Sequence, residues 1–243
     1  MTRIGIIGAA GRMGRAIAAL IEEAGGAVVA GGADEGDDVG ALAGRADALV
    51  DFSTPAALEA NLAAAVGAGV PIVVGTTGLM PEHQQLIEAA AKRIAILQSA
   101  NMSLGVNLLA HLVRVAAERL GPDWDVEILE MHHRAKVDAP SGTALLLGRA
   151  AAAGRGVALD SVSDRGRDGI TGARTSGHIG FASLRGGSVA GDHQVILAAE
   201  GERIELGHRA ESRAIFARGA VKAAVWIADK APGRYAMDDV LGL

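Results

Sequence analysis

The first hundred residues alternate short, continuously apolar runs with longer segments rich in Ala and Leu. The apolar runs have the composition of buried strands and lie at residues 3–7, 27–30, 48–52, 71–74 and 94–98. The longer segments have helical spacing and lie at residues 12–23, 56–67 and 81–92. Buried strands separated by amphipathic helices are typical of a parallel sheet that is covered on both faces. The N-terminal part is therefore predicted to be a doubly wound α/β domain with right-handed crossovers.

The pattern changes after Asn101. Predicted helices lie at residues 104–120, 141–153 and 215–228, and a short tail follows the last of them. Predicted strands lie at residues 126–131, 178–184, 193–199 and 203–207, with a long loop at residues 154–177. Turn signals at Gly186-Gly187 and Gly201-Glu202 favour antiparallel pairing of the last three strands. The change in pattern indicates a second, α+β domain, with a boundary near residues 102–104.

The charge and the composition exclude several classes of protein. The formal net charge is −5 and the chain has no long basic run, so it lacks the footprint of a nucleic-acid-binding protein. The absence of Cys excludes a disulfide scaffold, a thiol nucleophile and a thiolate metal site. The N-terminal apolar stretch is too short for a signal peptide or a membrane span. We therefore expect a cytoplasmic protein without nucleic-acid or membrane partners.

A glycine-rich turn follows the first predicted strand and opens the first predicted helix. Its glycines are Gly8, Gly11 and Gly14, with the spacing GxxGxxG, and Arg12 lies among them. Glycines let a pyrophosphate approach the backbone, and the amide groups at the start of a helix bind it. The turn therefore predicts dinucleotide binding, and the alternative is a tight strand–helix turn that binds no ligand.

Two adjacent carboxylates follow the second predicted strand. Asp34 lies 34 − 14 = 20 residues beyond Gly14, where dinucleotide-binding domains place the acid that binds the adenosine ribose. Glu35 follows it, where an Arg would be needed to bind the 2′-phosphate of NADPH. The pair predicts a preference for NADH over NADPH. The alternative is a solvated acidic loop, because Asp37 and Asp38 are also present.

Small polar residues follow the fourth and fifth predicted strands. These loops are Gly75-Thr76-Thr77-Gly78 and Ser99-Ala100-Asn101-Met102. In a doubly wound sheet, the loops after the carboxyl ends of the strands form the ligand crevice. We therefore expect both loops to contact the ribose and nicotinamide of the cofactor, although each loop taken singly is also compatible with an ordinary turn.

A segment rich in proton donors lies after the predicted strand at residues 126–131. It contains His132, His133 and Lys136, which can transfer protons or supply positive charge near neutral pH. Ser141 and Gly142 then open a helix whose free amide groups favour an anion such as a carboxylate. The segment predicts an active site for an anionic substrate. The alternatives are a structural basic loop and a metal site, which adjacent His residues rarely form.

The segment EMHHRAKVDAPSGTA, at residues 130–144, resembles the signature of the 4-hydroxy-tetrahydrodipicolinate reductase (dihydrodipicolinate reductase) family. GIIGAAGRMG, VVGTTG, SANMSLGVN and IGFASLRGGSVAGDH resemble the same family in order and spacing, so the likeness extends over nearly the whole chain. The resemblance implies a Rossmann-like dinucleotide-binding domain at residues 1–103, completed by residues 213–243. It also implies a substrate-binding and oligomerisation domain at residues 104–212, with a mixed, largely antiparallel sheet, and a homotetramer.

The resemblance further implies the reaction and the residues that perform it. In this family NADH or NADPH delivers a hydride to C4 of a cyclic dicarboxylate, water is lost from the precursor 4-hydroxy-tetrahydrodipicolinate, and tetrahydrodipicolinate results, in lysine and diaminopimelate biosynthesis. By the same resemblance, His132 and Lys136 are catalytic, and His133, Gly142 and Thr143 bind substrate carboxylate. No metal is expected. The implied cofactor contacts are Gly8, Ala9, Ala10, Gly11, Arg12, Met13, Asp34, Gly75, Thr76, Thr77, Ser99, Ala100, Asn101 and Met102.

Two features depart from the family pattern. The stretch between Gly36 and Asp47 is compressed, and Glu35 replaces the Arg of members that use either cofactor. Two rival hypotheses share the cofactor fold. A dehydrogenase acting on aspartate or its semialdehyde would not predict His132, His133, Lys136 and the Ser-Gly-Thr helix start together. A sensor that binds NADH without turnover would not depend on His132 or Lys136.

Overall fold

The chain forms two compact units, each with its own sheet and its own hydrophobic core. The computed structural model describes the backbone of residues 1–243 and all side chains except that of Ala24. The first unit contains Met1–Leu104 and Ala214–Leu243. The second unit contains Gly105–Arg213.

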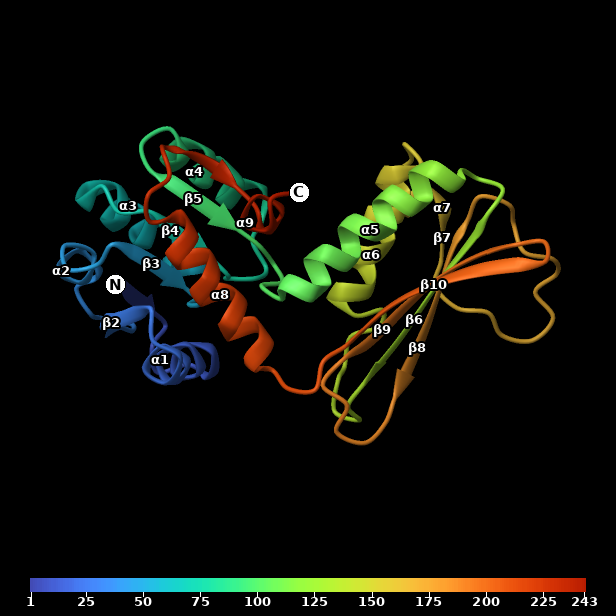
Figure 1. The fold of residues 1–243 in the computed structure, drawn as a ribbon, viewed down its shortest axis with the longest axis horizontal. Helices are drawn as coiled ribbons and strands as arrows, with labels where there is room; N and C mark the ends of the chain where they lie inside the picture. Colours follow the sequence, from blue (N-terminus) through green and yellow to red (C-terminus); the bar gives the residue numbers. More distant parts are fainter. The chain divides into compact units, whose positions relative to one another are not determined.

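The first unit is built on a six-stranded parallel sheet (Figure 1). The strand order is β11-β5-β4-β3-β1-β2. From β1 the chain adds β2 on one side and then β3, β4 and β5 on the other side, as in a doubly wound fold. The strands are β1 (Thr2–Ile7), β2 (Ala27–Ala33), β3 (Ala48–Asp51), β4 (Ile72–Val74), β5 (Ala95–Gln98) and β11 (Gly233–Tyr235). Strands β3 and β4 are buried along their whole length, which explains their continuously apolar sequences.

Helices cover both faces of this sheet. One layer consists of α1 (Arg12–Ala24), α8 (Ala214–Ile227) and α9 (Met237–Leu241), whose apolar residues share one core cluster. The other layer consists of α2 (Val39–Ala43), α3 (Leu58–Ala68) after the 3₁₀ turn η1 (Pro55–Ala57), and α4 (Pro81–Ala91). The C-terminal segment thus belongs to the same core as the N-terminal helix.

The predicted elements of the first unit are correct in type but incomplete. The second predicted strand ends before the first glycine, at residue 30, whereas β2 continues through Gly31 and Gly32 to Ala33. The compressed stretch between Gly36 and Asp47 contains the short helix α2. The predicted tail is wrong as a tail, because it forms β11 and α9. These elements are only three to five residues long, too short for hydrophobic periodicity to reveal them.

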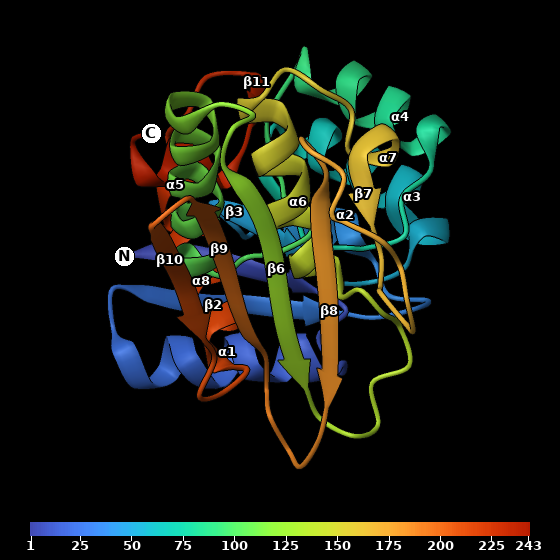
Figure 2. The ribbon, with the colours of Figure 1, turned by 90° about the vertical axis from the view of Figure 1, so that its right-hand side faces the viewer.

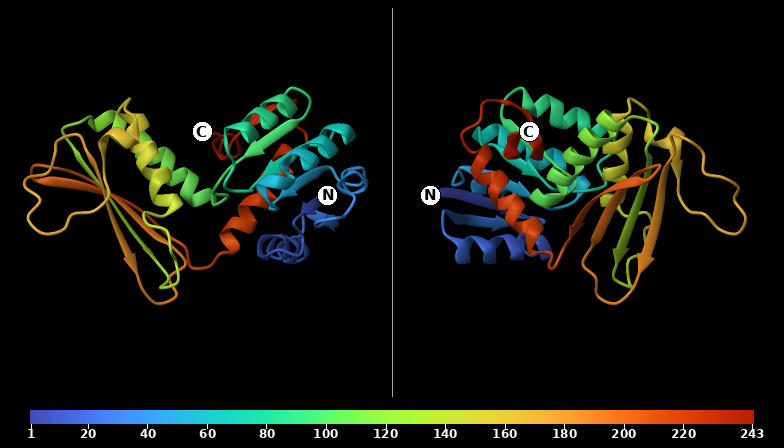
Figure 3. Two further views of the ribbon diagram at one scale, coloured as in Figure 1. Left: turned by 180° about the vertical axis from the view of Figure 1, so that it is seen from behind. Right: turned by 45° about the vertical axis from the view of Figure 1, so that its right-hand side comes forward.

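The second unit is built on a five-stranded mixed sheet in the order β10-β9-β6-β8-β7 (Figure 2). Its strands are β6 (Asp125–His132), β7 (Ser163–Asp164), β8 (Ile179–Arg185), β9 (Asp192–Ala199) and β10 (Glu202–Arg209). Helices α5 (Leu104–Leu120) and α6 (Gly142–Gly154) cover one face of the sheet, and α7 (Leu159–Val162) precedes β7 (Figure 3). In Figure 2 the opposite face of the sheet is turned to the viewer, with the helices behind it.

The hairpin predicted at Gly186-Gly187 does not form. β6 lies between β8 and β9, pairing parallel with β8 and antiparallel with β9. The turn signal instead marks a connection that crosses the end of β6, where the Gly186 amide donates to the His132 carbonyl at 2.9 Å. Only the turn at Gly201 joins neighbouring antiparallel strands, β9 and β10. This crossing brings the segment before β9 beside the end of β6, where the candidate catalytic residues lie.

Candidate active site

The glycine turn between β1 and α1 lies at the carboxyl edge of the first sheet. Gly8 has a φ of +78°, and a side chain there would lie 2.7 Å from the Phe52 carbonyl oxygen. A side chain on Gly14 would lie 2.3 Å from the Gly8 carbonyl oxygen. Gly11 is the N-cap of α1, so no side chain covers the first amide groups of the helix. The turn therefore offers the close backbone approach that a pyrophosphate needs.

Asp34 is joined directly to this turn. Its carboxylate follows β2 and accepts a hydrogen bond from the Ala10 amide, at 3.1 Å for Oδ1 and 3.0 Å for Oδ2. Glu35 follows it and is exposed. The glycine turn and the two acids are thus neighbours, and the residues fit the pyrophosphate and ribose of a dinucleotide.

The loops after β4 and β5 lie at the same edge of the sheet. The Ser99 amide donates to the Val74 carbonyl at 3.1 Å, which joins the two loops. A side chain on Gly75 would lie 2.3 Å from the Phe52 ring, so the loop after β3 is also in contact. Thr77 and Ala100 are exposed, whereas Met102 is 2% exposed and packs in the core between the sheet and α8. The side chain of Met102 is therefore not accessible to a ligand.

Asp51, at the end of β3, is a fully buried carboxylate that was not predicted as a site residue. It accepts hydrogen bonds from the Ser53 hydroxyl at 2.6 Å, from Asn61 at 3.0 Å and from the Thr76 hydroxyl at 3.2 Å. Thr76 is 6% exposed and its hydroxyl is directed at Asp51. The cluster fixes the loops after β3 and β4 to each other. The Thr76 side chain therefore stabilises the carboxyl edge of the sheet.

The alternation of β6 places two polar residues on the helix-covered face of the second sheet. Val126, Ile128, Glu130 and His132 are the buried positions of this strand. Glu130 is 1% exposed, and its Oε2 lies 2.5 Å from Nδ1 of His132. The period of two residues in a strand is the sequence signal that would have identified Glu130 as a buried carboxylate.

Glu130 has a partner on every side. Arg185, at the end of β8, donates to both of its oxygens at 2.8 Å, and the Ser141 amide donates to Oε1 at 3.2 Å. Burial alone raises the pKa of the Glu130 carboxyl, but hydrogen bonds from Arg185, His132 and Ser183 bring the pKa below its ordinary value. The carboxylate is therefore ionised at neutral pH, and its charge is compensated by the Arg185 guanidinium.

His193, on β9, is a further histidine at this site. Its ring meets that of His132 edge to face, with 5.1 Å between centroids, and its Nε2 lies 3.2 Å from the Ser141 hydroxyl. Burial and the neighbouring His132 lower the pKa of His193 to about 4, so this imidazole is neutral at physiological pH. Ser141 caps α6 by accepting from the Ala144 amide at 3.1 Å. The buried side chains of Glu130 and His193 thus fix the start of α6 through their contacts with Ser141.

The remaining predicted residues lie on the loop between β6 and α6 and at the start of that helix. Gly142 is exposed, and a side chain there would meet no atom within 4 Å, so the first turn of α6 is open; Thr143 follows it. The Lys136 ammonium donates to both oxygens of Asp138, at 2.8 and 2.9 Å. His133 directs its Nε2 at the Arg213 guanidinium, 3.0 Å away. Predicted catalytic and substrate-binding residues therefore share one short segment of the second unit.

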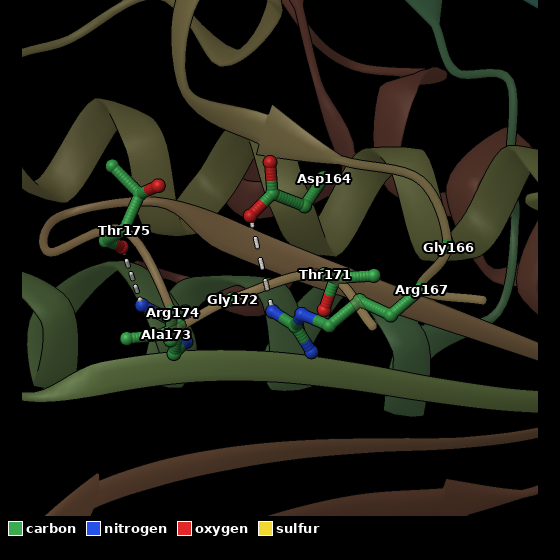
Figure 4. A pocket seen from close by; sticks show the side chains of 8 residues that line it. All are labelled: Asp164, Gly166, Arg167, Thr171, Gly172, Ala173, Arg174 and Thr175. Atoms are coloured by element: carbon green, nitrogen blue, oxygen red, sulfur yellow. Dashed lines mark hydrogen bonds and ion pairs between the residues drawn. The ribbon is translucent and has the colours of Figure 1, made fainter. Parts of the chain in front are cut away.

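The long loop of the second unit carries a separate hollow of about 390 Å³ (Figure 4). Arg167 and Arg174, which line it, both donate to Glu127 on the face of β6 opposite Glu130. Asp164 pairs with His178, with 2.9 Å between Oδ1 and Nδ1. Because these charges compensate one another, the two arginines support the loop.

The described residues contain neither a cluster of metal ligands nor a helix that could span a membrane. No group of three or more His, Cys, Asp or Glu side chains in this part of the chain could hold a metal ion. Within the same residues, no helix is long and apolar enough to cross a membrane.

Comparisons with known proteins agree over both units. The protein-family model for the N-terminal part of dihydrodipicolinate reductase matches residues 2–102, and the family model for its C-terminal part matches residues 105–241. The 4-hydroxy-tetrahydrodipicolinate reductase of Zymomonas mobilis is 59% identical, with 99% of this chain and 97% of the relative covered. The enzyme of the same name from Parvibaculum lavamentivorans is 56% identical, with 99% and 98% covered.

A solved structure shares the fold at lower identity. The dipicolinate-bound dihydrodipicolinate reductase of Paenisporosarcina sp. superimposes with a TM-score of 0.79 at 24% identity, covering 97% of each chain. This similarity bears on the fold alone: a Rossmann-like parallel sheet with helices on both faces, followed by a second, mixed sheet. The two family models together with the curated relatives establish that this chain belongs to the dihydrodipicolinate reductase family.

Proposed function

We propose that this chain is a cytoplasmic 4-hydroxy-tetrahydrodipicolinate reductase, which forms tetrahydrodipicolinate with NAD(P)H in lysine and diaminopimelate biosynthesis. The observation that carries the proposal is the buried Glu130–His132 pair, whose carboxylate also bonds the start of α6. A proton-transferring imidazole and a helix start that can bind a carboxylate are thereby joined in one site. The names of the relatives at 59% and 56% identity support the same activity.

In this proposal the first unit binds the cofactor. The glycine turn at Gly8–Met13 receives the pyrophosphate, which the amides of the first turn of α1 bind, and Asp34 binds hydroxyl groups of the adenosine ribose. The loops at residues 75–77 and 99–102 contact the remaining part of the cofactor. When bound, NAD(P)H supplies the hydride of the reaction. The bond between Ala10 and Asp34 supports this assignment, because it fixes turn and acid before a ligand arrives.

The second unit binds the cyclic dicarboxylate and transfers protons. Gly142 and Thr143 bind a substrate carboxylate at the open first turn of α6, and His133 adds a further contact. His132 exchanges a proton with the substrate through its imidazole ring. Lys136 delivers a proton from Nζ to the reduced ring, and its ammonium also balances the negative charge of the substrate.

A coupled assay tests the proposed function. The substrate is generated in situ from pyruvate and aspartate semialdehyde by the preceding synthase, and oxidation of the nicotinamide cofactor is followed by its absorbance. We expect oxidation that requires both precursors. A folded protein that binds NADH but oxidises neither cofactor in the presence of substrate would refute the proposal in favour of the NADH sensor.

The cofactor preference is a separate prediction. Glu35 is exposed beside Asp34, so its carboxylate should repel the 2′-phosphate of NADPH, and kcat/KM is expected to be higher with NADH. Glu35→Arg should raise kcat/KM for NADPH and leave that for NADH within a few-fold. Glu22→Arg makes the same change of charge at an exposed position of α1 and is the control. Equal kcat/KM values for the two cofactors in the unchanged protein would show that the charge argument fails.

We also propose a homotetramer built through the outer face of the second sheet. Leu184 on this face is 48% exposed, and the register places Leu129 of β6 and Ile196 of β9 on the same side of the sheet. Apolar side chains on the outer face of a sheet form the kind of surface that a second copy of the chain can cover. Leu184→Glu is expected to lower the mass measured by light scattering, and an unchanged tetramer mass would contradict this interface.

A further inference from the structure

Glu130 connects three parts of the candidate active site through one carboxylate. Oε2 bonds Nδ1 of His132, Oε1 accepts from the Ser141 amide at the start of α6, and the Arg185 guanidinium spans both oxygens. Arg185 also donates to the Asp138 carbonyl at 2.7 Å, so it fixes the loop that carries Lys136. Neither Glu130 nor Arg185 was assigned a role from the sequence.

We propose that Glu130, supported by Arg185, is a positioning residue that fixes the protonation pattern of the His132 ring and the start of α6. The inference deepens the proposed function, because it assigns the atom at which His132 exchanges its proton. A carboxylate accepts hydrogen bonds and cannot donate one when ionised, so Nδ1 of His132 carries the hydrogen. Proton exchange is therefore confined to Nε2.

The surroundings of Nε2 agree with this assignment. A side chain on Gly191 would lie 3.1 Å from Nε2 of His132, and Gly191 has a φ of +154° that disfavours other residues. Glycine therefore leaves the space beside Nε2 free of a side chain from this position. His193 packs against the flank of the same ring and is neutral, so it adds no charge that competes with Glu130.

The carboxamide of Glu130→Gln distinguishes a positioning role from a purely structural ion pair. Every partner of the native carboxylate is a donor, so the new NH₂ group must face one of them. The Ser141 amide, which faces Oε1, cannot become an acceptor, whereas Nδ1 of a neutral His132, which faces Oε2, can. The Ser183 hydroxyl can donate or accept, so it opposes neither orientation of the carboxamide. The NH₂ group is therefore expected to face His132 and to move the ring hydrogen from Nδ1 to Nε2. A merely structural role predicts lower stability with the hydrogen still on Nδ1.

The test is ¹⁵N NMR of the histidine rings in the full chain without substrate, in weakly alkaline buffer where free imidazole is neutral. We expect the unchanged protein to carry the hydrogen of His132 on Nδ1 and Glu130→Gln to carry it on Nε2. In the coupled assay, kcat of this variant should fall by roughly two powers of ten, with KM within a few-fold. Asp164→Asn is the matched control, because it removes the carboxylate of another histidine pair in the same unit, and kcat should not change.

The outcomes separate this inference from the proposed function. A His132 hydrogen that stays on Nδ1 in Glu130→Gln, or an unchanged kcat in an active enzyme, would overturn the positioning role. A shifted hydrogen in a protein without reductase activity would support the positioning role and refute the proposed reaction. Should Glu130→Gln fail to fold, Arg185→Lys is the second variant. It keeps the positive charge but loses the paired hydrogen bonds from one guanidinium to both oxygens of Glu130. It should lower kcat about tenfold, and a kcat equal to that of the unchanged protein would overturn the proposal.

Discussion

Lys136→Ala is expected to lower kcat by about two to four powers of ten while NADH still binds. The Lys136 ammonium is the proposed proton donor and lies on the loop between β6 and α6, where Asp138 holds it at 2.8 and 2.9 Å. Alanine removes the proton and the positive charge but preserves the backbone bond from the residue 136 amide to the His133 carbonyl. The measurement is steady-state kinetics in the coupled assay, together with NADH titration.

Two controls show whether the lost activity reflects the lost ammonium group. Lys222→Ala removes a lysine from an exposed position on α8 and should leave kcat unchanged. Small primary amines added to Lys136→Ala should restore part of the turnover, because they can donate a proton in the space of the missing side chain. A Lys136→Ala enzyme with near-normal kcat would remove the residue from the mechanism.

Gly219→Ala is expected to disrupt the first unit. A side chain at this buried position of α8 would lie 1.7 Å from the Met102 carbonyl oxygen and 2.8 Å from its carbonyl carbon. The opposing atoms belong to the backbone after β5, so a change of rotamer cannot relieve the overlap. Overpacking of this kind costs about 1 to 3 kcal/mol or more, and we expect a loss of at least about 3 kcal/mol in the free energy of unfolding.

Gly67→Ala is the matched control for this effect. Gly67 lies in the helix α3, and a side chain there would meet no atom within 4 Å. Alanine is favoured over glycine in a helix by up to about 1 kcal/mol, so the control should be neutral or stabilising. Urea unfolding of both variants compares the two. A Gly219→Ala protein as stable as Gly67→Ala would show that α8 does not pack against Met102 as described.

The fold class follows from hydrophobic periodicity, which fails where an element is short or where glycines interrupt it, as in β2. Buried runs such as β3 and β4 have one composition along their length, so their sequences indicate a parallel sheet directly. β11 has only three residues and is defined by its pairing with β5, which is a tertiary contact. The place of β6 between β8 and β9 is likewise a matter of topology, and a glycine pair alone suggested a hairpin.

The sequence predicts those residues of the site that lie close together in the chain. His132, Lys136 and Gly142 lie within one segment, so residue types and a helix start were sufficient to select it. Arg185 and His193 reach the same cluster from β8 and β9, more than forty residues later in the chain, and only the sheet register brings them together. The roles of the predicted residues remain predictions that the variants above test.

Transfer of deuterium from [4-²H]NADH to the product tests the central claim most directly. The chain is mixed with deuterated NADH and with substrate generated from pyruvate and aspartate semialdehyde, and the product is analysed by mass spectrometry and NMR. The proposed function predicts tetrahydrodipicolinate with one deuterium at C4 when the label occupies the transferred face. Product without deuterium from either labelled face of the cofactor, or no product from folded and NADH-bound protein, would contradict it.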